Sequence, residues 1–590
     1  MAGTQVSTAT GTHGAIKNTY DYVIIGGGTA GLTVGDRLSE SGKCKKLSTP
    51  SIRRVSSLTT FQEPEGYRQG QTTYNITSAP SPGLNNRTFQ VDVGCIVGGS
   101  SAINGRIFQR GTAKDYEIWD ELGGIGNKST WNWENLLGYF KKGITLTPPK
   151  PEIPAAFDVR YDTQYWGHNT SNHSIFATFG NLIKPSVFPM HEAIKKFPGI
   201  ELSPDGGSGQ HGMYYYMTSS DPHTGRRSYS RTGHWDGLNR TNYDLLVATR
   251  VNKIVFERGT AVGVQITPRG GDRRFSSIVR ARKEVILAAG SLHTPQILQL
   301  SGIGPANLLK RAKIPVEVDL PGVGSNFQDH AFIPEVSFRW GTAPLTPFSL
   351  TNTTIIPDGL GGISLGVSIP LPVVSPGGFS SIASRFETQD PAAYLPKGTH
   401  ATVIEGYLQQ KRIYAREMRL RSFSALRFSV TGEPSFQPIN IHPVSRGTVY
   451  IDPDAAPETE PIVDYRAASN PIDIDIAVAE IKFLRQLMTT GELAQYNATE
   501  LAPGSEYDTD EKLGAWVRGK IIPSVYHPVG TTPKMPRERG GVVGEDLLVY
   551  GVKRLSVVDA SIMPTIVAAT TSMSVYAIAE KAADLIKARQ

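Results

Sequence analysis

The chain has 590 residues, 39% of them hydrophobic and 19% charged, and its formal net charge is +7. This length exceeds what one hydrophobic core usually organises, so we expect a globular protein of two domains. Lys and Arg are scattered and form no basic block interleaved with aromatics, which argues against nucleic-acid binding. No apolar run is long enough to span a membrane.

The first 19 residues are polar and rich in Thr and Ser, so we expect a flexible N-terminus without the order of a signal peptide. Eight N-x-S/T sequons point instead to a secretory lineage, and the sequence leaves the compartment open between cytoplasmic and secretory. The sequons are at Asn75, Asn86, Asn127, Asn169, Asn172, Asn239, Asn352 and Asn497. Two cysteines, Cys44 and Cys95, make no disulfide framework and resemble no metal site.

Residues 21–31 are typical of a short buried strand that runs into a glycine turn and then a helix. The turn has G-x-G-x-x-G spacing, with glycines at Gly26, Gly28 and Gly31. The first glycine allows the tight turn, the second lets backbone approach a pyrophosphate, and the third packs helix against strand. The free N–H groups and positive dipole of the helix N-terminus then face the phosphates. The pattern predicts a dinucleotide-binding turn.

Three later segments look like further pieces of a nucleotide-binding domain. They are the small-residue loop 94–104, a buried strand at 284–290 that leads into 291–304, and a strand at 554–560 followed by a loop and a final helix. That helix carries a one-sided apolar stripe at 3–4 spacing. The stripe consists of Val575, Ile578, Ala579, Ala582, Leu585 and Ile586, and Lys587 and Arg589 close the helix.

The intervening stretches differ in character. Residues 140–240 are rich in aromatics, Pro and sequons, and residues 335–530 contain alternating segments such as 447–452, which suit an antiparallel sheet. We therefore predict a nucleotide-binding domain assembled from dispersed segments, with a substrate domain inserted between them.

Together these segments resemble the glucose–methanol–choline (GMC) oxidoreductase family of flavoproteins, from residue 20 to 587. Residues 98–104, followed by Phe108 and Gly111, look like its first signature, and residues 290–304 fit its second at every fixed position. Tyr526-His-Pro-Val-Gly-Thr531 looks like its catalytic-histidine motif, and residues 558–560 with 577–582 resemble its C-terminal block. Residues 536–543 are most like fungal members, among them aryl-alcohol oxidases, patulin synthase and versicolorin B synthase.

The resemblance implies an α/β fold of two domains and FAD as the cofactor. The Rossmann-like FAD-binding domain would comprise residues 20–125, 241–330 and 531–590. The substrate-binding domain, with an antiparallel sheet, would comprise residues 126–240 and 331–530. Asn104 would bind near the isoalloxazine, Val251 on a strand at 246–251 would contact the adenine side, and Asp559 would meet the ribityl–pyrophosphate region through its loop. The full implied FAD-binding set is Gly26, Gly28, Thr29, Ala30, Gly31, Val97, Gly98, Gly99, Ser100, Ser101, Asn104, Val251, Gly290, Asp559, Ala560 and Thr571.

The family oxidises an alcohol by hydride transfer to the flavin while a base takes the hydroxyl proton, and an electron acceptor such as oxygen or a quinone re-oxidises the flavin. His527 is the expected base, because a neutral imidazole suits that role near physiological pH. Thr571 and Ser572 are good caps for the last helix, whose N-terminus would stabilise negative charge on the reduced flavin. The expected substrate is a small aromatic or polyketide-derived alcohol.

The sequence departs from the family at Thr570, where many relatives carry a second histidine or an asparagine. A threonine hydroxyl is far too weak an acid–base group to replace imidazole, so we expect no two-histidine mechanism. Either His527 works alone while Thr570 orients the substrate, or the chemistry is altered. Versicolorin synthase, which resembles a redox flavoprotein, performs a non-redox cyclisation, so a flavin-retaining cyclase or dehydratase is the alternative.

A second departure follows the glycine turn. Family members have a second strand that ends in an acidic residue for the adenosine ribose. Here there is no apolar strand and no Asp or Glu between Glu40 and Glu63. We therefore expect residues 44–68 to reflect a gene-model error, or the chain to be a non-catalytic remnant that no longer binds FAD. Cys95 replaces the usual basic or amide residue before the small-residue loop and would weaken a contact there.

Overall fold

The computed structural model describes residues 18–42, 46–49, 72–124, 129–149, 151, 158–168, 173–179, 187–269, 276–344, 365–430 and 432–589. The predicted flexible N-terminus and most of the segment 44–68 lie outside these residues. No helix within the described ranges is both long enough and apolar enough to cross a membrane.

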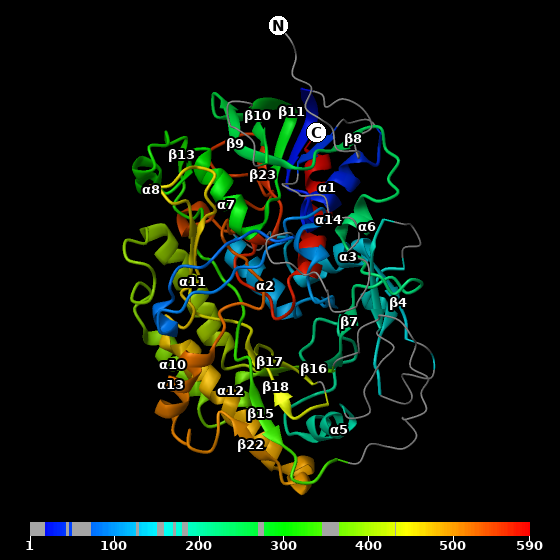
Figure 1. Ribbon diagram of the computed structural model, residues 1–590, viewed down its shortest axis with the longest axis vertical. Coiled ribbons are helices and arrows are strands. Elements are labelled where there is room, and N and C mark those ends of the chain that lie inside the picture. The colour runs from blue at the N-terminus through cyan, green and yellow to red at the C-terminus, as the bar shows by residue number, and fades with distance from the viewer. Residues whose placement is uncertain are drawn as a thin grey trace.

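A central sheet organises one end of the molecule (Figure 1), and its strands come from distant parts of the chain. Its order is β8-β2-β1-β11-β10-β9, and β23 also pairs with β11. The strands β8, β2, β1, β11 and β23 are parallel, whereas β9 and β10 form an antiparallel extension. Their bounds are β1 Thr19–Ile25, β2 Lys46–Thr49, β8 Tyr243–Leu245, β9 Thr249–Glu257, β10 Thr260–Pro268, β11 Ser277–Leu287 and β23 Leu555–Val557.

The second strand of this sheet is present, which corrects the sequence-based expectation. Lys46–Thr49 pairs in parallel with Tyr22–Ile25 on one side and with β8 on the other. Pairing on both edges satisfies the backbone of this short strand, so an apolar run was not required for it to form. The strand that sequence analysis placed at 246–251 is also different. The chain turns at Ala248, where φ is +53°, and Val251 belongs to β9.

The helices α1 (Thr29–Ser39) and α14 (Ser572–Ala588) pack against each other beside the central sheet (Figure 1). Helix α14 also packs against α3 (Trp133–Gly143), and every residue from Met573 to Ala583 is buried. The predicted one-sided stripe is therefore wrong, because neighbours surround the helix and cover its polar positions as well.

A buried ion pair joins the two helices. The Arg37 Nε donates to both carboxylate oxygens of Glu580 at 2.8 Å, and the two side chains are 5% and 0% exposed. Removing one partner of such a pair leaves a buried charge uncompensated. We expect Arg37→Met to lower the free energy of unfolding by about 3–5 kcal/mol, measured by chemical denaturation.

The matched control is Arg280→Met, which removes an exposed ion pair with Glu257 and should cost about 1 kcal/mol or less. Replacing Glu580 as well, in the double variant Arg37→Met/Glu580→Met, should recover part of the loss. Equal losses for the Arg37 and Arg280 variants would contradict this account.

The opposite end of the molecule is built on antiparallel strands (Figure 1). The main sheet has the order β14-β19-β17-β16-β6, and a three-stranded sheet β18-β15-β22 lies at the same end. The bounds are β6 Gly212–Tyr215, β14 Ala331–Phe332, β15 Val336–Arg339, β16 Leu365–Pro370, β17 Ser424–Val430, β18 Ser435–Phe436, β19 Ile439–Asn440 and β22 Thr499–Ala502. The α/β fold class is confirmed, and the domain boundaries stay a prediction.

Smaller sheets and helices complete the fold. A four-stranded sheet contains β3 (Ile107–Phe108), β7 (Met217–Thr218), β5 (Ile175–Phe179) and β4 (Ile144–Thr147). The expected strand within 447–452 is present as β20 (Thr448–Tyr450), which pairs antiparallel with β21 (Ile462–Asp464). The short strands β12 (Ile303–Gly304) and β13 (Val318–Asp319) pair in parallel. The remaining helices are α2 Ala113–Gly123, α5 Phe188–Lys196, α6 Ser230–His234, α7 Gly290–Leu300, α8 Ala306–Arg311, α9 Leu371–Val374, α10 Phe379–Thr388, α11 Ala401–Glu417, α12 Pro471–Thr489 and α13 Asp510–Lys520.

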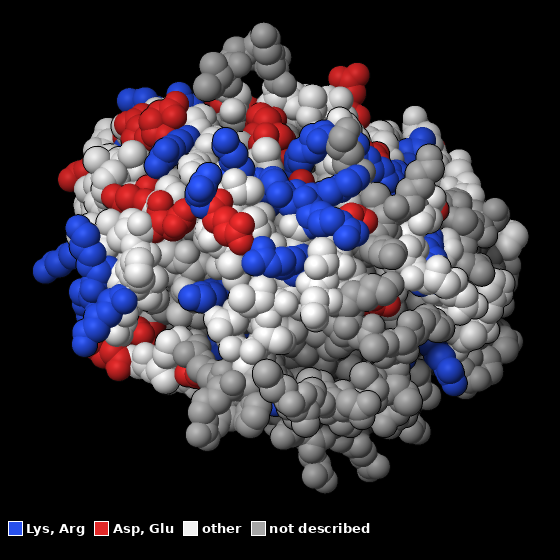
Figure 2. All heavy atoms as spheres, turned by 90° about the horizontal axis from the view of Figure 1, so that it is seen from above, with Lys and Arg blue, Asp and Glu red and all other residues white. Residues whose placement is uncertain are grey.

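The face above the central sheet carries mixed charge (Figure 2). Lys and Arg side chains lie among Asp and Glu side chains there. The strands of the sheet themselves carry exposed ion pairs, Arg280 with Glu257 and Arg282 with Asp21. The described part of this face therefore carries exposed charges of both signs.

Candidate active site

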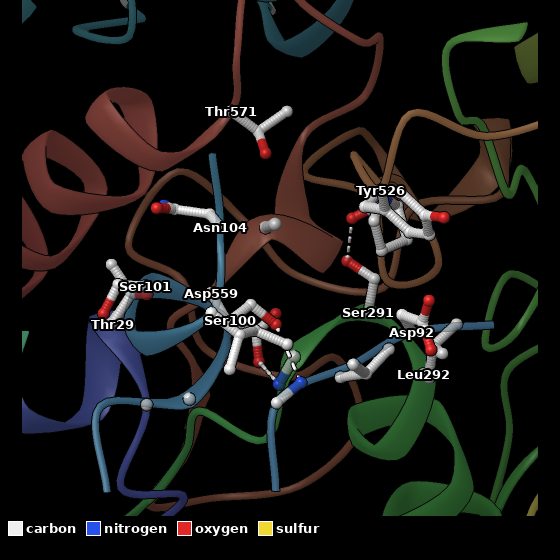
Figure 3. A pocket seen from close by; sticks show the side chains of 18 of the residues that line it. Thr29, Asp92, Ser100, Ser101, Asn104, Ser291, Leu292, Tyr526, Asp559 and Thr571 are labelled. Carbon is white, nitrogen blue, oxygen red and sulfur yellow. Dashed lines mark hydrogen bonds between the residues drawn. The ribbon is translucent and has the colours of Figure 1, made fainter. Parts of the chain in front are cut away.

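A cavity of about 1220 Å³ lies between the two ends of the molecule. Its walls come from the glycine turn before α1, the loop 92–107, the first turns of α7 and α14, and one face of the main antiparallel sheet. In Figure 3, Thr29, Ser100, Ser101 and Asn104 lie on one side, and Ser291, Leu292, Asp92 and Tyr526 on the other. The volume exceeds the ~300–1,000 Å³ of ordinary ligand pockets, which suits a dinucleotide together with a substrate.

Most residues predicted to bind the cofactor line this cavity. They are Gly26, Gly28, Thr29, Ala30, Gly99, Ser100, Ser101, Asn104, Val251, Gly290, Asp559, Ala560 and Thr571, and the predicted catalytic residues His527 and Thr570 line it too. Three predicted residues do not. Gly31 packs behind the turn, where a Cβ would lie 2.0 Å from the carbonyl oxygen of Gly26. Gly98 donates its N–H to the Gly27 carbonyl, and Val97 lies beside it off the cavity wall.

The glycine turn forms a cradle that side chains would fill. Gly26 has φ of +119°, and a Cβ there would lie 2.1 Å from the carbonyl oxygen of Ala288. A Cβ on Gly99 would lie 2.8 Å from the Cα of Gly28, so the two loops approach each other this closely because residue 99 is glycine. Gly28 is the N-cap of α1 and provides no side-chain cap, which leaves the first N–H groups of the helix for an anion. This cradle fits the pyrophosphate of a dinucleotide.

Helix α14 presents its N-terminus to the same cavity. Thr571 occupies the predicted N-cap position, and Thr571, Ser572 and Val575 line the wall. Neither predicted capping side chain makes the bond, since Thr571 caps no N–H group and the buried Ser572 hydroxyl has no partner. The N-terminal N–H groups of α14 thus remain available to stabilise negative charge in the cavity.

A second histidine contacts His527, which the sequence did not predict. The Nδ1 atoms of His330 and His527 lie 2.9 Å apart, and the two rings meet edge to face at 90°. The Nε2 of His330 lies 3.1 Å from the carbonyl oxygen of Ile441. Two segments almost 200 residues apart in the chain thereby form one imidazole pair at the cavity.

These contacts define the tautomer of His527. A carbonyl oxygen only accepts, so the His330 Nε2 carries a proton and donates it to Ile441. Burial lowers the pKa of His330 well below its ordinary value, so His330 is neutral and its Nδ1 accepts. The His527 Nδ1 therefore donates to His330, which leaves the His527 Nε2 with a free lone pair. This is the arrangement that a general base needs.

Asp329 holds the backbone of both histidines. Its Oδ1 accepts the N–H of His527 at 3.0 Å and that of His330 at 2.8 Å, while its Oδ2 accepts the Ser524 hydroxyl at 2.7 Å. Burial raises the pKa of Asp329 to about 7 against these hydrogen bonds. A proton on Oδ2 reverses only the bond to Ser524, so the Oδ1 contacts to the histidines persist on either side of neutral pH.

Comparison with known proteins decides the family. The sequence profile described as GMC oxidoreductase matches residues 20–332, and its C-terminal counterpart matches residues 443–579. The chain belongs to the GMC oxidoreductase family. It is 36% identical to the dehydrogenase xptC of Emericella nidulans, over 96% of this chain and 93% of the relative. It is also 31% identical to the glucose methanol choline oxidoreductase atC of Aspergillus terreus, over 96% and 92%.

Comparison with solved structures gives the same family. A fungal aryl-alcohol oxidase superposes with a TM-score of 0.89 at 34% identity, covering 97% of this chain and 100% of that one. An FAD-dependent oxidoreductase from Chaetomium thermophilum gives 0.88 at 31% identity, covering 97% and 99%. FAD is therefore the cofactor of this GMC oxidoreductase, and the glycine cradle is built to receive it.

Asp559 lines the cavity of this GMC oxidoreductase and anchors the loop on which it stands. Its buried carboxylate accepts the Gly290 N–H at 2.9 Å (Figure 3), the Thr294 hydroxyl at 2.6 Å and the Ser561 N–H at 2.8 Å. The carboxylate is thus occupied in fixing the start of α7 to the loop after β23. Ala560 on the same loop lines the cavity, so Asp559 shapes the FAD-binding wall chiefly through the loop it holds.

Asn104 and Cys95 are both paired with arginines. Arg227 and the N–H of Arg106 donate to the Asn104 carbonyl oxygen, so its amide N–H groups remain to donate into the cavity. Cys95 accepts from Arg269, which also stacks over the Tyr74 ring. The cysteine therefore has a partner, and the basic group that the family usually places before the small-residue loop comes here from the end of β10.

Acidic side chains reach the cavity from another direction than the family pattern predicts. Glu458 and Glu460 line it together with Val251, and Glu460 lies 2.7 Å from the His293 Nε2. They come from the segment between β20 and β21, not from the end of β2. The wall of the GMC cavity near Val251 thus carries carboxylates although the sequence between Glu40 and Glu63 has none.

The environment of His527 favours a neutral imidazole. Burial and the nearby positive charge of Arg427 lower the pKa of His527 to about 3. As pH falls the base is lost only when this pKa is reached, so kcat/KM for an alcohol should stay level from pH 8 down to about 5. A profile of kcat/KM measured at constant ionic strength checks this, and a midpoint near the ordinary histidine value of ~6.5 would contradict it.

Proposed function

We propose that this GMC oxidoreductase oxidises a small aromatic or polyketide-derived alcohol, with His527 as the base. The observation that carries the proposal is the His330–His527 contact, which leaves the Nε2 of His527 unprotonated in a residue that lines a cavity with room for FAD and a substrate. The likeness to a fungal aryl-alcohol oxidase supports an aromatic alcohol as substrate, and the likeness to the dehydrogenase xptC supports an oxidation.

Different residues of the chain have separate roles in the proposed reaction. The His527 Nε2 accepts the hydroxyl proton of the alcohol, and His330 keeps the ring in the required tautomer. The Thr570 hydroxyl donates to the Ile107 carbonyl at 3.1 Å, so its oxygen can accept one hydrogen bond from the substrate and orient it. The cradle at Gly26, Gly28 and Gly99 would hold FAD, which would supply the hydride acceptor, with oxygen or a quinone as the final electron acceptor. The start of α14 stabilises the negative charge that this transfer creates.

The alternative is a flavin-retaining cyclase or dehydratase. The feature that favours it is Thr570, which cannot serve as a second acid–base group. A cyclase would still use the His527 Nε2 to take a hydroxyl proton, but the substrate would undergo no net oxidation. The remnant hypothesis has less support, because the second strand, the cradle and the histidine pair are all in place.

Anaerobic titration of the purified flavoprotein distinguishes these functions. We expect a panel of benzylic alcohols to bleach the oxidised flavin spectrum with one equivalent of aldehyde formed per flavin. Substrate consumption with the flavin still oxidised would favour the cyclase. Protein that takes up no FAD on reconstitution would favour the remnant.

A further inference from the structure

Arg427 lies on the sheet face that roofs the cavity. The strand register places it opposite Ile439 of β19, which in turn lies opposite Phe332 of β14. All three side chains line the cavity, and Ser429, two residues further along β17, lines it as well. This row is on the same wall as the histidine pair, because His330 immediately precedes β14 and contacts the Ile441 carbonyl just beyond β19.

The charge of Arg427 has no counter-ion. The residue is only 3% exposed, and its Nε has no hydrogen-bond partner. Its guanidinium carbon lies 5.0 Å from the centre of the Tyr216 ring, a cation–π contact that offsets part of the cost of burial. Across the described ranges, no Asp or Glu forms an ion pair with Arg427. Glu433 also lines the cavity, but its side chain is exposed and forms no ion pair with Arg427. A buried guanidinium without a carboxylate is costly unless a ligand completes it.

Polar groups surround Arg427. Ser368 lies opposite it on β16, and the buried Ser368 hydroxyl has no partner. The hydroxyls of Tyr214 and Tyr216 lie close enough to interact with the Arg427 guanidinium. Gly366 makes room for the tyrosines, since a Cβ there would lie 2.5 Å from the Tyr216 ring. The fold thus places a cation and the unpartnered Ser368 hydroxyl in one buried place, and both groups can donate to an anionic oxygen.

We propose that Arg427 binds a carboxylate on the substrate, so that the enzyme acts on an alcohol that also carries a carboxylate group. This inference rests on the proposed function, because it names the substrate class of that same cavity. A planar guanidinium pairs with a carboxylate through two parallel hydrogen bonds, which fixes both the position and the orientation of the ligand. The alcohol end of the molecule then lies toward His527.

Binding of a carboxylate would also activate the base. The positive charge of Arg427 contributes, after burial, to lowering the pKa of His527. A carboxylate on Arg427 cancels that charge, so the pKa of His527 rises and its Nε2 becomes a better proton acceptor. An alcohol with the carboxylate would therefore gain in rate as well as in affinity over its neutral analogue.

Binding of benzoate and benzamide to the FAD-loaded enzyme tests the inference without turnover. The Kd of each is read from the change that it causes in the flavin absorption spectrum. We expect wild-type enzyme to bind benzoate at least about tenfold more tightly than benzamide. Arg427→Gln should raise the Kd for benzoate by about 30-fold or more and change the Kd for benzamide by no more than about twofold. The Kd of Arg427→Lys for benzoate should lie between the wild-type and Arg427→Gln values, because lysine keeps the charge but lacks the planar guanidinium.

Arg412→Gln, at an exposed position of α11, is the matched control and should change neither Kd. Equal binding of benzoate and benzamide by the wild type would overturn the proposal, as would an Arg427→Gln enzyme that keeps the preference for benzoate. If Arg427→Gln fails to fold or to hold FAD, the wild-type preference and the Arg427→Lys value decide.

The outcomes separate this inference from the proposed function. If the enzyme prefers benzoate because of Arg427 but no alcohol bleaches its flavin, the anion site is supported and alcohol oxidation is rejected. Bleaching by neutral benzylic alcohols without any preference for benzoate would sustain the oxidation and reject the anion site. Comparing 4-(hydroxymethyl)benzoate with its methyl ester then shows the gain in kcat and the fall in KM expected for the anion.

Discussion

Replacing His527 with alanine lowers kcat for a benzylic alcohol by about 10²–10⁴-fold, the usual contribution of a positioned general base. FAD remains bound, because His527 contributes no part of the glycine cradle. The loss arises because the hydroxyl proton then has no acceptor in the buried wall. The measurement is the rate constant of anaerobic flavin reduction, with flavin content determined on the same preparation.

The control for that variant is His168→Ala, at an exposed histidine outside the cavity, which should keep wild-type rates. An external proton acceptor such as imidazole should restore part of the rate of His527→Ala. Full turnover by His527→Ala would show that His527 is not the general base.

Replacing His330 with phenylalanine removes the acceptor for the His527 Nδ1 proton while it keeps a ring of similar size. We expect kcat to fall by about 10–100-fold, the scale on which partners that orient a functional histidine act. The His527 ring loses the contact that selects its tautomer, so part of the population presents a protonated Nε2 to the substrate. KM should change little, because His330 is fully buried behind His527.

His330→Asn discriminates positioning from mere packing. Its side-chain carbonyl can accept the Nδ1 proton of His527, so it should recover most of the rate lost in His330→Phe. An asparagine variant as slow as the phenylalanine variant, with equal melting temperatures, would mean that acceptance of this proton is not what His330 provides.

The glycine turn and the later signature segments predicted the fold well, because their residue types follow from local sterics. Gly26 adopts the positive φ that its place requires, and the strand expected at 284–290 is present as the end of β11, followed by α7. The sequence was misleading where tertiary pairing overrides local preference. β2 forms from Lys46–Thr49 because both of its edges are paired, and α14 is buried all round because neighbours enclose it.

The candidate site was only half predictable. His527 lies in the motif Tyr526-His-Pro-Val-Gly-Thr531, whereas the sequence analysis assigned His330 and Arg427 to no motif. Their place on the same wall depends on the register of β14, β19 and β17. A single sequence carries no signal for which of 12 histidines will contact another across almost 200 residues. The expectation of no two-histidine mechanism, which rests on Thr570, stays a prediction. His330 is a contact of His527 that this expectation did not include.

The most direct test is NMR of the FAD-loaded enzyme with nitrogen-15 in its histidines, assigned by comparison with His527→Asn and His330→Asn. At pH 7 we predict that His527 is neutral and protonated on Nδ1, and that His330 is neutral and protonated on Nε2. A His527 signal showing the proton on Nε2, or on both ring nitrogens, would contradict the account, because no lone pair would then face the alcohol.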